Sequence, residues 1–489
     1  MFTDPLLRFR WAFCQLDSLA QCPHEEAIEK ALVSLPQNLE ETYRRLIECI
    51  PTELKNDAMR LLQFLVHSKR PLKLAEAKEV IATQIGKESS GFSTRRRLIR
   101  ETDVLRYCPS LVTVVHATNK ELRLAHFSVK EYLLRENQFE ISTASISITR
   151  TCLTYLTDIN SSYKDIKQGF PMARYAAEVW TDHAALAQTS EDMARMMVTF
   201  LEEEVTFHRW VGLYQADRGW DNDPGPARGS RLYYASYLGL LAPAQSLISK
   251  GADVNAQGGE YSNALYAASY RGHQEIVALL LANGAEVNAQ GGDYGNALQV
   301  ASYRGHHEIV TLILAGGADV NAQGGKYGNT LQAASYRGYQ EVVALLLANG
   351  ANVNAQGGAY GNALSAVSYR GHQEIVALLL ASGADVNAQG GAYGNALSAA
   401  SQEGHREIVM LLLKKMVNIN MQDSYHDNAF LAYFSWYKAH QAASKGGHQE
   451  IFELLQTHRD FIINATLSRT PSNRAKTLCL MGPEPFYQT

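Results

Sequence analysis

Apolar residues in the second half of the chain recur at the spacing expected of two short helices. Leu265 and Ala268 lie three positions apart, which places them on one face of a helix. A second apolar run, 276–281, has the same helical character. Gly272 and Gly284 follow the two runs, and glycine ends a helix at little cost because it readily adopts left-handed backbone angles. The pattern predicts a pair of short helices, each closed by a glycine.

The same unit returns at an interval of 33 residues, the separation of Gly251 and Gly284. After the second helix of each copy, a Gly-Gly pair such as Gly291-Gly292 predicts a tight β-turn that projects from the helices. One unit cannot bury its own apolar face, but stacked units bury one another's, so the period predicts a repeat solenoid. The period is marked by Gly251, Gly284, Gly317, Gly350 and Gly383, and by Asn255, Asn288, Asn321, Asn354, Asn387 and Asn420.

This unit closely resembles an ankyrin repeat. The family's Thr-Pro-Leu-His tetrapeptide appears in altered form as Asn-Ala-Leu-Tyr at 263–266, and Asn is a good N-cap for the helix that follows. We expect about seven ankyrin repeats over residues 229–464, beginning with a degenerate cap near Gly229. The last copy is interrupted near 430–440, either by an aromatic loop or by an artefact of the coding sequence. Residues 465–489 have no periodicity and are expected to be disordered.

Two positions of the unit vary between copies, and the resemblance places both on or near the concave face on which ankyrin repeats bind their partners. One position lies in the hairpin and is occupied by Glu260, Asp293, Lys326, Ala359 and Ala392. The other lies in the first helix and is occupied by Tyr266, Gln299, Gln332, Ser365 and Ser398.

A Tyr-Arg pair precedes the glycine that ends each first helix, at a position that contacts partners in the ankyrin family. Tyr and Arg are enriched at binding hot spots, and stacked repeats would align the pairs as a ladder. Alternatively, Tyr packs on its neighbours and Arg is merely solvated, or duplication has copied the pair. The predicted partner-binding residues are Tyr270, Arg271, Tyr303, Arg304, Tyr336, Arg337, Tyr369, Arg370, Glu260, Asp293 and Lys326.

A histidine recurs at the start of the second helix, and a metal site requires several such ligands gathered at one point. Histidines spaced 33 residues apart do not meet this requirement by themselves. Ankyrin repeats use this histidine to bond a neighbouring loop, so we expect the same structural role here. The histidines are His273, His306, His372, His405 and His448.

The N-terminal half predicts mainly helices. Three helices followed by two strands joined at 118–120 suggest a winged-helix-like domain over 1–140, and apolar helical stretches continue over 141–225. The predicted fold class is mainly α: an ankyrin solenoid preceded by a winged-helix-like domain and a helical segment. Helices are predicted at 24–34, 39–49, 53–67, 74–83 and 128–135, and strands at 110–116 and 121–126.

This half resembles the winged-helix and helical segments of fungal NACHT–ankyrin proteins, a class of nucleotide-switch receptors. The most specific stretch is His126-Phe127-Ser128-Val129-Lys130-Glu131-Tyr132-Leu133. In that family an NTPase module precedes these segments, but this sequence has no G-x-x-x-x-G-K-[ST] phosphate loop. We therefore expect a fragment, a truncated gene model or a receptor without its switch, and a structural role for His126. Further matching stretches are 9–17, Leu35-Pro36, 41–43 and 70–72.

Composition further limits the partners and the cellular compartment that the sequence predicts. The formal net charge of −4 does not suggest binding to nucleic acid or to an anionic membrane. The six cysteines include no C-x-x-C pair, which favours free thiols in a reducing compartment, so we expect a cytoplasmic protein, with the nucleus as the alternative. No apolar run is long enough to span a membrane.

These features favour a protein-binding scaffold or sensor that has no catalytic residue, metal, cofactor or small-molecule substrate. One alternative is nucleic-acid binding through the winged helix, but its candidate recognition helix at 74–83 carries Glu76, Lys78 and Glu79 and is nearly neutral. The run 95–97 is basic, although such a run is more often a solvated loop. A second alternative is a nucleotide-driven switch whose NTPase is missing, and a third is an enzyme, for which no G-x-S-x-G elbow is present.

Overall fold

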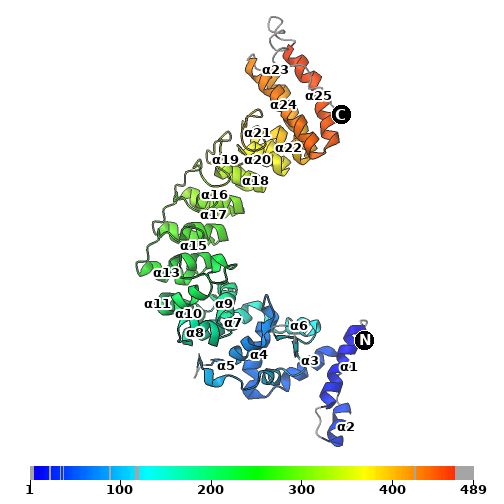
Figure 1. Cartoon of the computed structure of the whole chain (residues 1–489), viewed down its shortest axis with the longest axis vertical. Helices are drawn as coiled ribbons and strands as arrows, with labels where there is room; N and C mark the ends of the chain where they lie inside the picture. The colour runs from blue at the N-terminus through cyan, green and yellow to red at the C-terminus, as the bar shows by residue number, and fades with distance from the viewer. Residues whose placement is uncertain are drawn as a thin grey trace. The chain divides into compact units, whose positions relative to one another are not determined.

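The computed structural model describes residues 5–20, 24–33, 35–36, 38–86, 90–115, 120–422 and 426–467. They belong to two compact units, Met1–Asp253 and Val254–Thr489. Helices dominate both units (Figure 1). The predicted turn residues 118–119 and most of the predicted tail, from 468 onward, lie outside the described residues.

The first part of the N-terminal unit combines helices with a small antiparallel sheet in the strand order β1-β5-β4. Leu122 of the central strand is fully buried and pairs with Leu72 on one side and Val114 on the other. The predicted helices and strands are all present, with ends shifted by at most two residues. The elements are α1 (Pro5–Ala20), α2 (Glu25–Val33), α3 (Leu39–Glu48), α4 (Thr52–His67), β1 (Leu72–Lys73), α5 (Leu74–Ala82), β4 (Val112–Val115), β5 (Glu121–Leu124) and α6 (Phe127–Leu133).

A second hairpin, which the sequence pattern did not predict, follows α5. Strand β2 (Thr83–Ile85) pairs with β3 (Ser90–Phe92), and the short helix η1 (Thr94–Arg96) comes next. The prediction of a solvated basic loop at 95–97 is therefore only partly right. Arg95 and Arg96 are exposed, but the Arg97 side chain pairs with the buried carboxylate of Glu79.

The rest of the N-terminal unit is a helical segment with an aromatic core. Trp180 and Trp210 are fully buried with ring centroids 4.9 Å apart, and the Trp210 indole donates to the carbonyl of Ala177. Tyr234 packs 5.4 Å from Trp210, so the degenerate first repeat shares this core. The helices are α7 (Ile141–Asp158), α8 (Tyr163–Gly169), α9 (Ala173–Ala187), α10 (Glu191–Glu202), α11 (Glu204–Leu213), α12 (Arg231–Leu238) and α13 (Leu241–Ser249).

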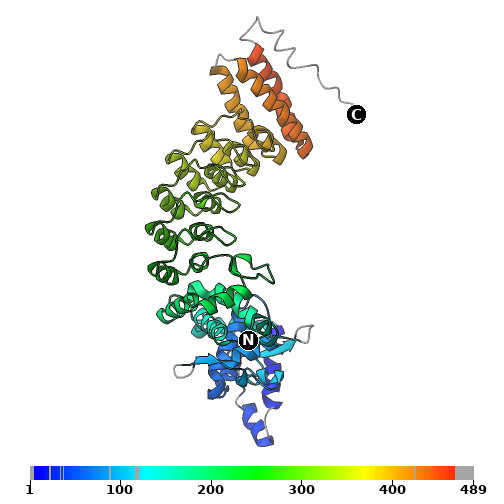
Figure 2. The ribbon, with the colours of Figure 1, turned by 60° about the vertical axis from the view of Figure 1, so that its left-hand side comes forward.

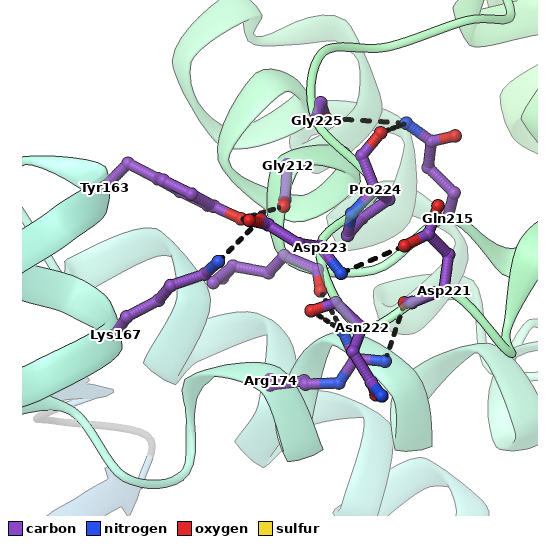
Figure 3. A network of polar contacts seen from close by, with 11 residues as sticks. Tyr163, Lys167, Arg174, Gly212, Gln215, Asp221, Asn222, Asp223, Pro224 and Gly225 are labelled. Atoms are coloured by element: carbon purple, nitrogen blue, oxygen red, sulfur yellow. Dashed lines mark hydrogen bonds and ion pairs between the residues drawn. The ribbon is translucent and has the colours of Figure 1, made fainter.

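The connection from α11 to the degenerate repeat is held by side chains of α8 and α9 (Figure 3). Arg174 donates to the carbonyls of Leu213, Asp221 and Asn222. The Lys167 ammonium lies 2.6 Å from the Asp223 carboxylate. Fixed carbonyls and a paired carboxylate order a stretch that has almost no regular structure of its own.

In the second unit, helix pairs are stacked in chain order (Figure 1). Each first helix from α14 to α22 begins at an Asn whose side chain caps it, as Asn329 accepts from the backbone N–H of Gln332. The pairs are α14 (Ala264–Arg271) and α15 (Gln274–Ala282), α16 (Ala297–Arg304) and α17 (His307–Ala315), α18 (Thr330–Arg337) and α19 (Gln340–Ala348), α20 (Ala363–Arg370) and α21 (Gln373–Ala381), α22 (Ala396–Glu403) and α23 (Arg406–Gln422), and α24 (His426–Gly446) and α25 (Gln449–Leu467).

The last repeat departs from the prediction. The stretch 430–440 is not a loop but lies within the long helix α24, which packs against α22 and α25. The preceding loop is also lost, because Met416 stands 33 residues after Gly383 and α23 continues through Asn420 to Gln422. Without a glycine to adopt left-handed angles, nothing in the sequence ends the helix at the usual point.

The hairpins between repeats are in direct backbone contact, as successive loops projecting from the helix pairs suggest (Figure 2). The N–H of Lys326 donates to the carbonyl of Asp293, and the N–H of Ala359 donates to the carbonyl of Lys326. A Cβ placed on Gly358 would lie 2.3 Å from the backbone carbonyl carbon of Tyr327. In three hairpins the second glycine of the pair, Gly325, Gly358 or Gly391, is thus required by close approach as well as by the turn.

Replacing Gly358 with Ala should destabilise the repeats more than the same change at Gly350. Both residues have left-handed φ angles, +64° and +83°, so each Ala carries a conformational cost of about 1–2 kcal/mol. Only Gly358 faces a neighbouring backbone, whereas Gly350 has no atom within 4 Å, so Gly358→Ala should cost about 1–3 kcal/mol more. Hydrogen exchange of amides 329–370 would measure the difference. Equal effects would show that the hairpin contact contributes little.

Candidate protein-binding surface

The tyrosines of the repeats form one continuous stack, here called the tyrosine column. The hairpin tyrosines Tyr294, Tyr327, Tyr360 and Tyr393 are stacked nearly parallel, with successive ring centroids 6.1, 6.3 and 6.0 Å apart. The first-helix tyrosines pack between them, as Tyr303 does at 4.3 Å from Tyr294 and 5.1 Å from Tyr327. Members of the column are Tyr270, Tyr294, Tyr303, Tyr327, Tyr336, Tyr360, Tyr369 and Tyr393.

An arginine from each following repeat lies over a tyrosine of this column. The guanidinium carbon of Arg304 is 4.7 Å from the centroid of the Tyr270 ring, and Arg337 lies 5.0 Å from that of Tyr303. Arg370 stands 5.0 Å from the Tyr336 ring centroid in the same way. These distances are within the range of cation–π attraction. The structure therefore brings the predicted Tyr-Arg pairs together, with tyrosine packed in the column and arginine exposed above it.

The two variable positions of the repeat have opposite environments. Glu260, Asp293 and Lys326 are exposed at the hairpin tips. The first-helix position, in contrast, is buried in all five copies, so the prediction that it contributes to the binding face is wrong. Its residues are Tyr266, Gln299, Gln332, Ser365 and Ser398.

Three of the buried first-helix residues, Tyr266, Gln299 and Gln332, form hydrogen bonds with the hairpins. Gln299 accepts from the N–H of Asn296 and donates to the carbonyl of Ala322, 3.0 Å away in the next hairpin. The Tyr266 hydroxyl accepts from the N–H of Tyr294 at 3.1 Å. Within the described residues, the buried hydroxyls of Ser365 and Ser398 at the same position have no hydrogen-bond partner.

The repeated histidine links two of the repeats to the first helix of the repeat before. Nε2 of His405 donates to the carbonyl of Tyr369 at 3.0 Å, and Nε2 of His448 donates to that of Gln402 at 2.9 Å. The imidazole also covers the glycine at the end of that helix, since a Cβ on Gly371 would lie 2.5 Å from His405. Within the described residues no group of His, Cys, Asp or Glu side chains is arranged to hold a metal ion.

Charge is separated between the two helices of a repeat. The second helices from α15 to α23 each carry an exposed glutamate in the first turn, where the helix dipole favours a negative charge. The arginines belong to the ends of the first helices, beside the tyrosine column. The glutamates are Glu275, Glu308, Glu341, Glu374 and Glu407.

The helix predicted as a candidate recognition helix, at 74–83, corresponds to α5 in the winged-helix region. Helix α5 is buried along most of its length, and its acidic side chains are paired in the interior. Glu76 receives two hydrogen bonds from Arg70, and Glu79 is bound by Arg97 and by the Tyr155 hydroxyl. His126 caps α6, with Nδ1 accepting the backbone N–H of Ser128.

Comparison with known proteins agrees with this architecture. Models of ankyrin repeats match residues 232–324, 290–357 and 330–423, and the winged helix domain of GPI inositol-deacylase matches residues 46–144. The chain thus carries an ankyrin-repeat array preceded by a winged-helix domain. No helix in the described part of the chain has the length and apolar character that crossing a membrane requires.

A curated relative is the azaphilone pigments biosynthesis cluster protein L of Monascus ruber, 36% identical over 276 residues. The match covers 49% of this chain and 58% of the relative, so it spans little more than half of that protein. Among solved structures, the human ASB11 ankyrin repeat domain matches with 27% identity and a TM-score of 0.35, covering 38% of this chain and 84% of that one.

Removing one ring from the middle of the tyrosine column should destabilise the repeats strongly. Tyr327 is only 5% exposed and touches rings from three repeats, so Tyr327→Ala should cost about 3–5 kcal/mol, as expected for a buried aromatic residue. Tyr327→Phe keeps the ring and should cost less than about 1.5 kcal/mol. Urea denaturation followed by circular dichroism would compare the variants. If Tyr327→Ala and Tyr327→Phe lost similar stability, the hydroxyl of Tyr327 and not the stacked ring would account for the loss.

The repeats should lose stability as the pH falls below about 6.5. Burial lowers the pKa of His306 and His372 below the ordinary 6.5, so the unfolded chain binds protons more readily than the folded one. The stability contributed by the two neutral histidines is complete above the pKa that they have in the unfolded chain. It is lost as the pH falls through their lower pKa in the folded protein. Urea midpoints between pH 7.5 and 5 should fall less steeply in His372→Gln than in the unchanged protein. If the urea midpoints of the variant and the unchanged protein fell in parallel, His372 would be excluded as a source of the pH dependence.

Proposed function

We propose that this protein is a non-catalytic interaction scaffold or sensor that binds a protein partner on the exposed face of its ankyrin repeats. The binding residues are the arginines over the tyrosine column and the charged hairpin tips Glu260, Asp293 and Lys326. The observation that carries the proposal is the arginine arrangement. Arg304, Arg337 and Arg370 are exposed, yet each is held in place by a tyrosine of the preceding repeat.

A preordered arginine is well suited to binding. Ordering a long side chain on association costs about 0.5–1.5 kcal/mol, and stacking on tyrosine reduces that cost in advance. Arginine is also among the residue types most enriched at binding hot spots. The tyrosines contribute by holding the arginines, and their partial burial leaves them a smaller direct share of contact.

The relation to nucleotide-switch receptors is a second part of the proposal. The match to a winged-helix domain before the repeats supports an origin among fungal NACHT–ankyrin proteins. In that setting the chain would act in the cytoplasm or nucleus, with or without a separate NTPase. Nucleic-acid binding through the winged helix is the weaker alternative, because α5 is buried and its glutamates are paired.

Affinity capture from a fungal extract with matched baits tests the binding face. The full chain is compared with an arginine variant and with a glutamate variant that changes as many charges on the second helices. Proteins retained by the unchanged chain and the glutamate variant should fall to background with the arginine variant. The arginine variant is Arg304→Gln, Arg337→Gln and Arg370→Gln, and the glutamate variant is Glu308→Gln, Glu341→Gln and Glu374→Gln.

Quantitative mass spectrometry of the captured proteins gives the comparison, and circular dichroism confirms that both variants remain folded. Equal recovery with all three baits would reject the arginines as the binding face. Recovery lost equally in both variants would indicate a general charge effect and would reject the proposal as well.

A further inference from the structure

We infer that Tyr294 and Tyr303 are an oxidative modification site, and that they form a covalent dityrosine crosslink when hydrogen peroxide and a haem peroxidase oxidise the protein. Both residues belong to the tyrosine column. The inference concerns the oxidation chemistry of these two rings and does not depend on the partner proposed above. It follows from the overlap of the rings, from the contact between their hydroxyl groups and from their partial exposure.

The two rings have the shortest separation of any pair in the tyrosine column. Their centroids are 4.3 Å apart and their planes meet at 32°. So short a separation at so small an angle places the faces of the rings against each other. Two phenoxyl radicals couple by overlap of the p orbitals that stand perpendicular to each ring. Rings that meet by their faces are therefore well placed to form a carbon–carbon bond.

The fold holds both side chains in this position. Tyr294 lies in a hairpin whose backbone is fixed by the hydrogen bond from its own N–H to the Tyr266 hydroxyl, at 3.1 Å. Tyr303 belongs to α16, and on its other side Tyr327 packs with its ring centroid 5.1 Å away. Positioning of this kind replaces a chance encounter between two rings with a contact that is already made before oxidation begins.

The hydroxyl groups of the pair are in contact, which brings the reactive ring carbons together. Burial raises the pKa of Tyr294, and its hydrogen bond with Tyr303 raises it further. Burial also acts to raise the pKa of Tyr303, but hydrogen bonds with Tyr327 and Tyr294 bring this pKa below the ordinary value of a tyrosine. The Tyr294 hydroxyl is thus the donor and the Tyr303 oxygen the acceptor. Coupling joins the ring carbons next to the hydroxyl-bearing carbons, so hydroxyls in contact favour it.

Exposure separates this pair from the neighbouring one. Tyr294 and Tyr303 are both half-buried, so an oxidant can reach the rings and water can take up the released protons. Tyr327 also contacts Tyr303, but it is only 5% exposed and its centroid lies farther away. The partner of Tyr303 in the crosslink is therefore Tyr294.

The crosslink is a two-electron oxidation. Each tyrosine loses one electron and one proton, which leaves two adjacent tyrosyl radicals. Their unpaired electrons form a bond between two ring carbons, and the hydrogen atom on each of these carbons moves to the phenolic oxygen as the rings regain aromaticity. Hydrogen peroxide takes up both electrons and both protons through the haem of the peroxidase and becomes two molecules of water. The protein thus loses two hydrogen atoms.

Mass spectrometry of the full chain after treatment with peroxide and peroxidase tests the inference. Trypsin cleaves after Arg271 and Arg304 and releases residues 272–304, in which Tyr294 and Tyr303 are the only tyrosines. This peptide should lose the mass of two hydrogen atoms, and its fragment spectrum should lack backbone ions between the two residues. The yield should not change with protein concentration, because both rings belong to one chain. Samples without peroxidase give the background.

Phenylalanine variants provide matched controls. Tyr294→Phe and Tyr303→Phe should each reduce the crosslink in this peptide to background, because phenylalanine keeps a ring in the stack but has no O–H hydrogen to lose. Tyr163→Phe removes a hydroxyl from a tyrosine that is 39% exposed and lies outside the column, and it should leave the yield unchanged. Circular dichroism confirms that the three variants remain folded.

Three results would overturn the inference. These are the absence of the two-hydrogen loss in the unchanged protein, a crosslink that joins only separate chains, and an undiminished yield in Tyr294→Phe or Tyr303→Phe. None of these measurements involves a partner protein. A negative result therefore leaves the proposed binding face untouched, and failure of the binding face leaves the crosslink untouched.

Discussion

Close backbone approach between successive hairpins is the constraint on which the repeat unit depends. A Cβ on Gly325, Gly358 or Gly391 would lie 2.3 Å from the carbonyl carbon of a tyrosine in the preceding hairpin. Only glycine permits this contact, and the contact lets one hairpin tip donate a hydrogen bond to the one before. Because the backbones meet, the hairpin tyrosines stack about 6 Å apart and leave gaps that the first-helix tyrosines fill.

In this arrangement the two residues of each Tyr-Arg pair have different environments. Tyrosine packs on its neighbours and arginine remains at the surface, while binding by the pair stays a prediction. The arginine is nevertheless not a freely solvated side chain, because the preceding repeat supplies a ring beneath it. A duplicated unit therefore creates a surface that no single unit contains.

The ends of the array show how the repeat pattern is adapted to different neighbours. At the N-terminal end, the degenerate copy joins the aromatic core of the helical segment through Tyr234 and Trp210. At the C-terminal end, the glycine that would end α23 is replaced and the last helices are longer. In α24 and α25, Trp436 donates to the carbonyl of Leu455 and closes the final pair.

The sequence alone predicted the local and periodic features of the chain. Asn caps, helix-ending glycines and apolar spacing act within a few residues, so the ends of the repeat helices could be predicted, as could five helices and two strands of the N-terminal unit within two residues. Other features depend on contacts between residues distant in sequence. Variation alone could not distinguish the exposed tip position from the buried first-helix position, because Gln299 meets its partner 23 residues away, at Ala322 in the next hairpin. Burial of Glu79 likewise required Arg97 and Tyr155 to converge on it from separate elements, which no local pattern records.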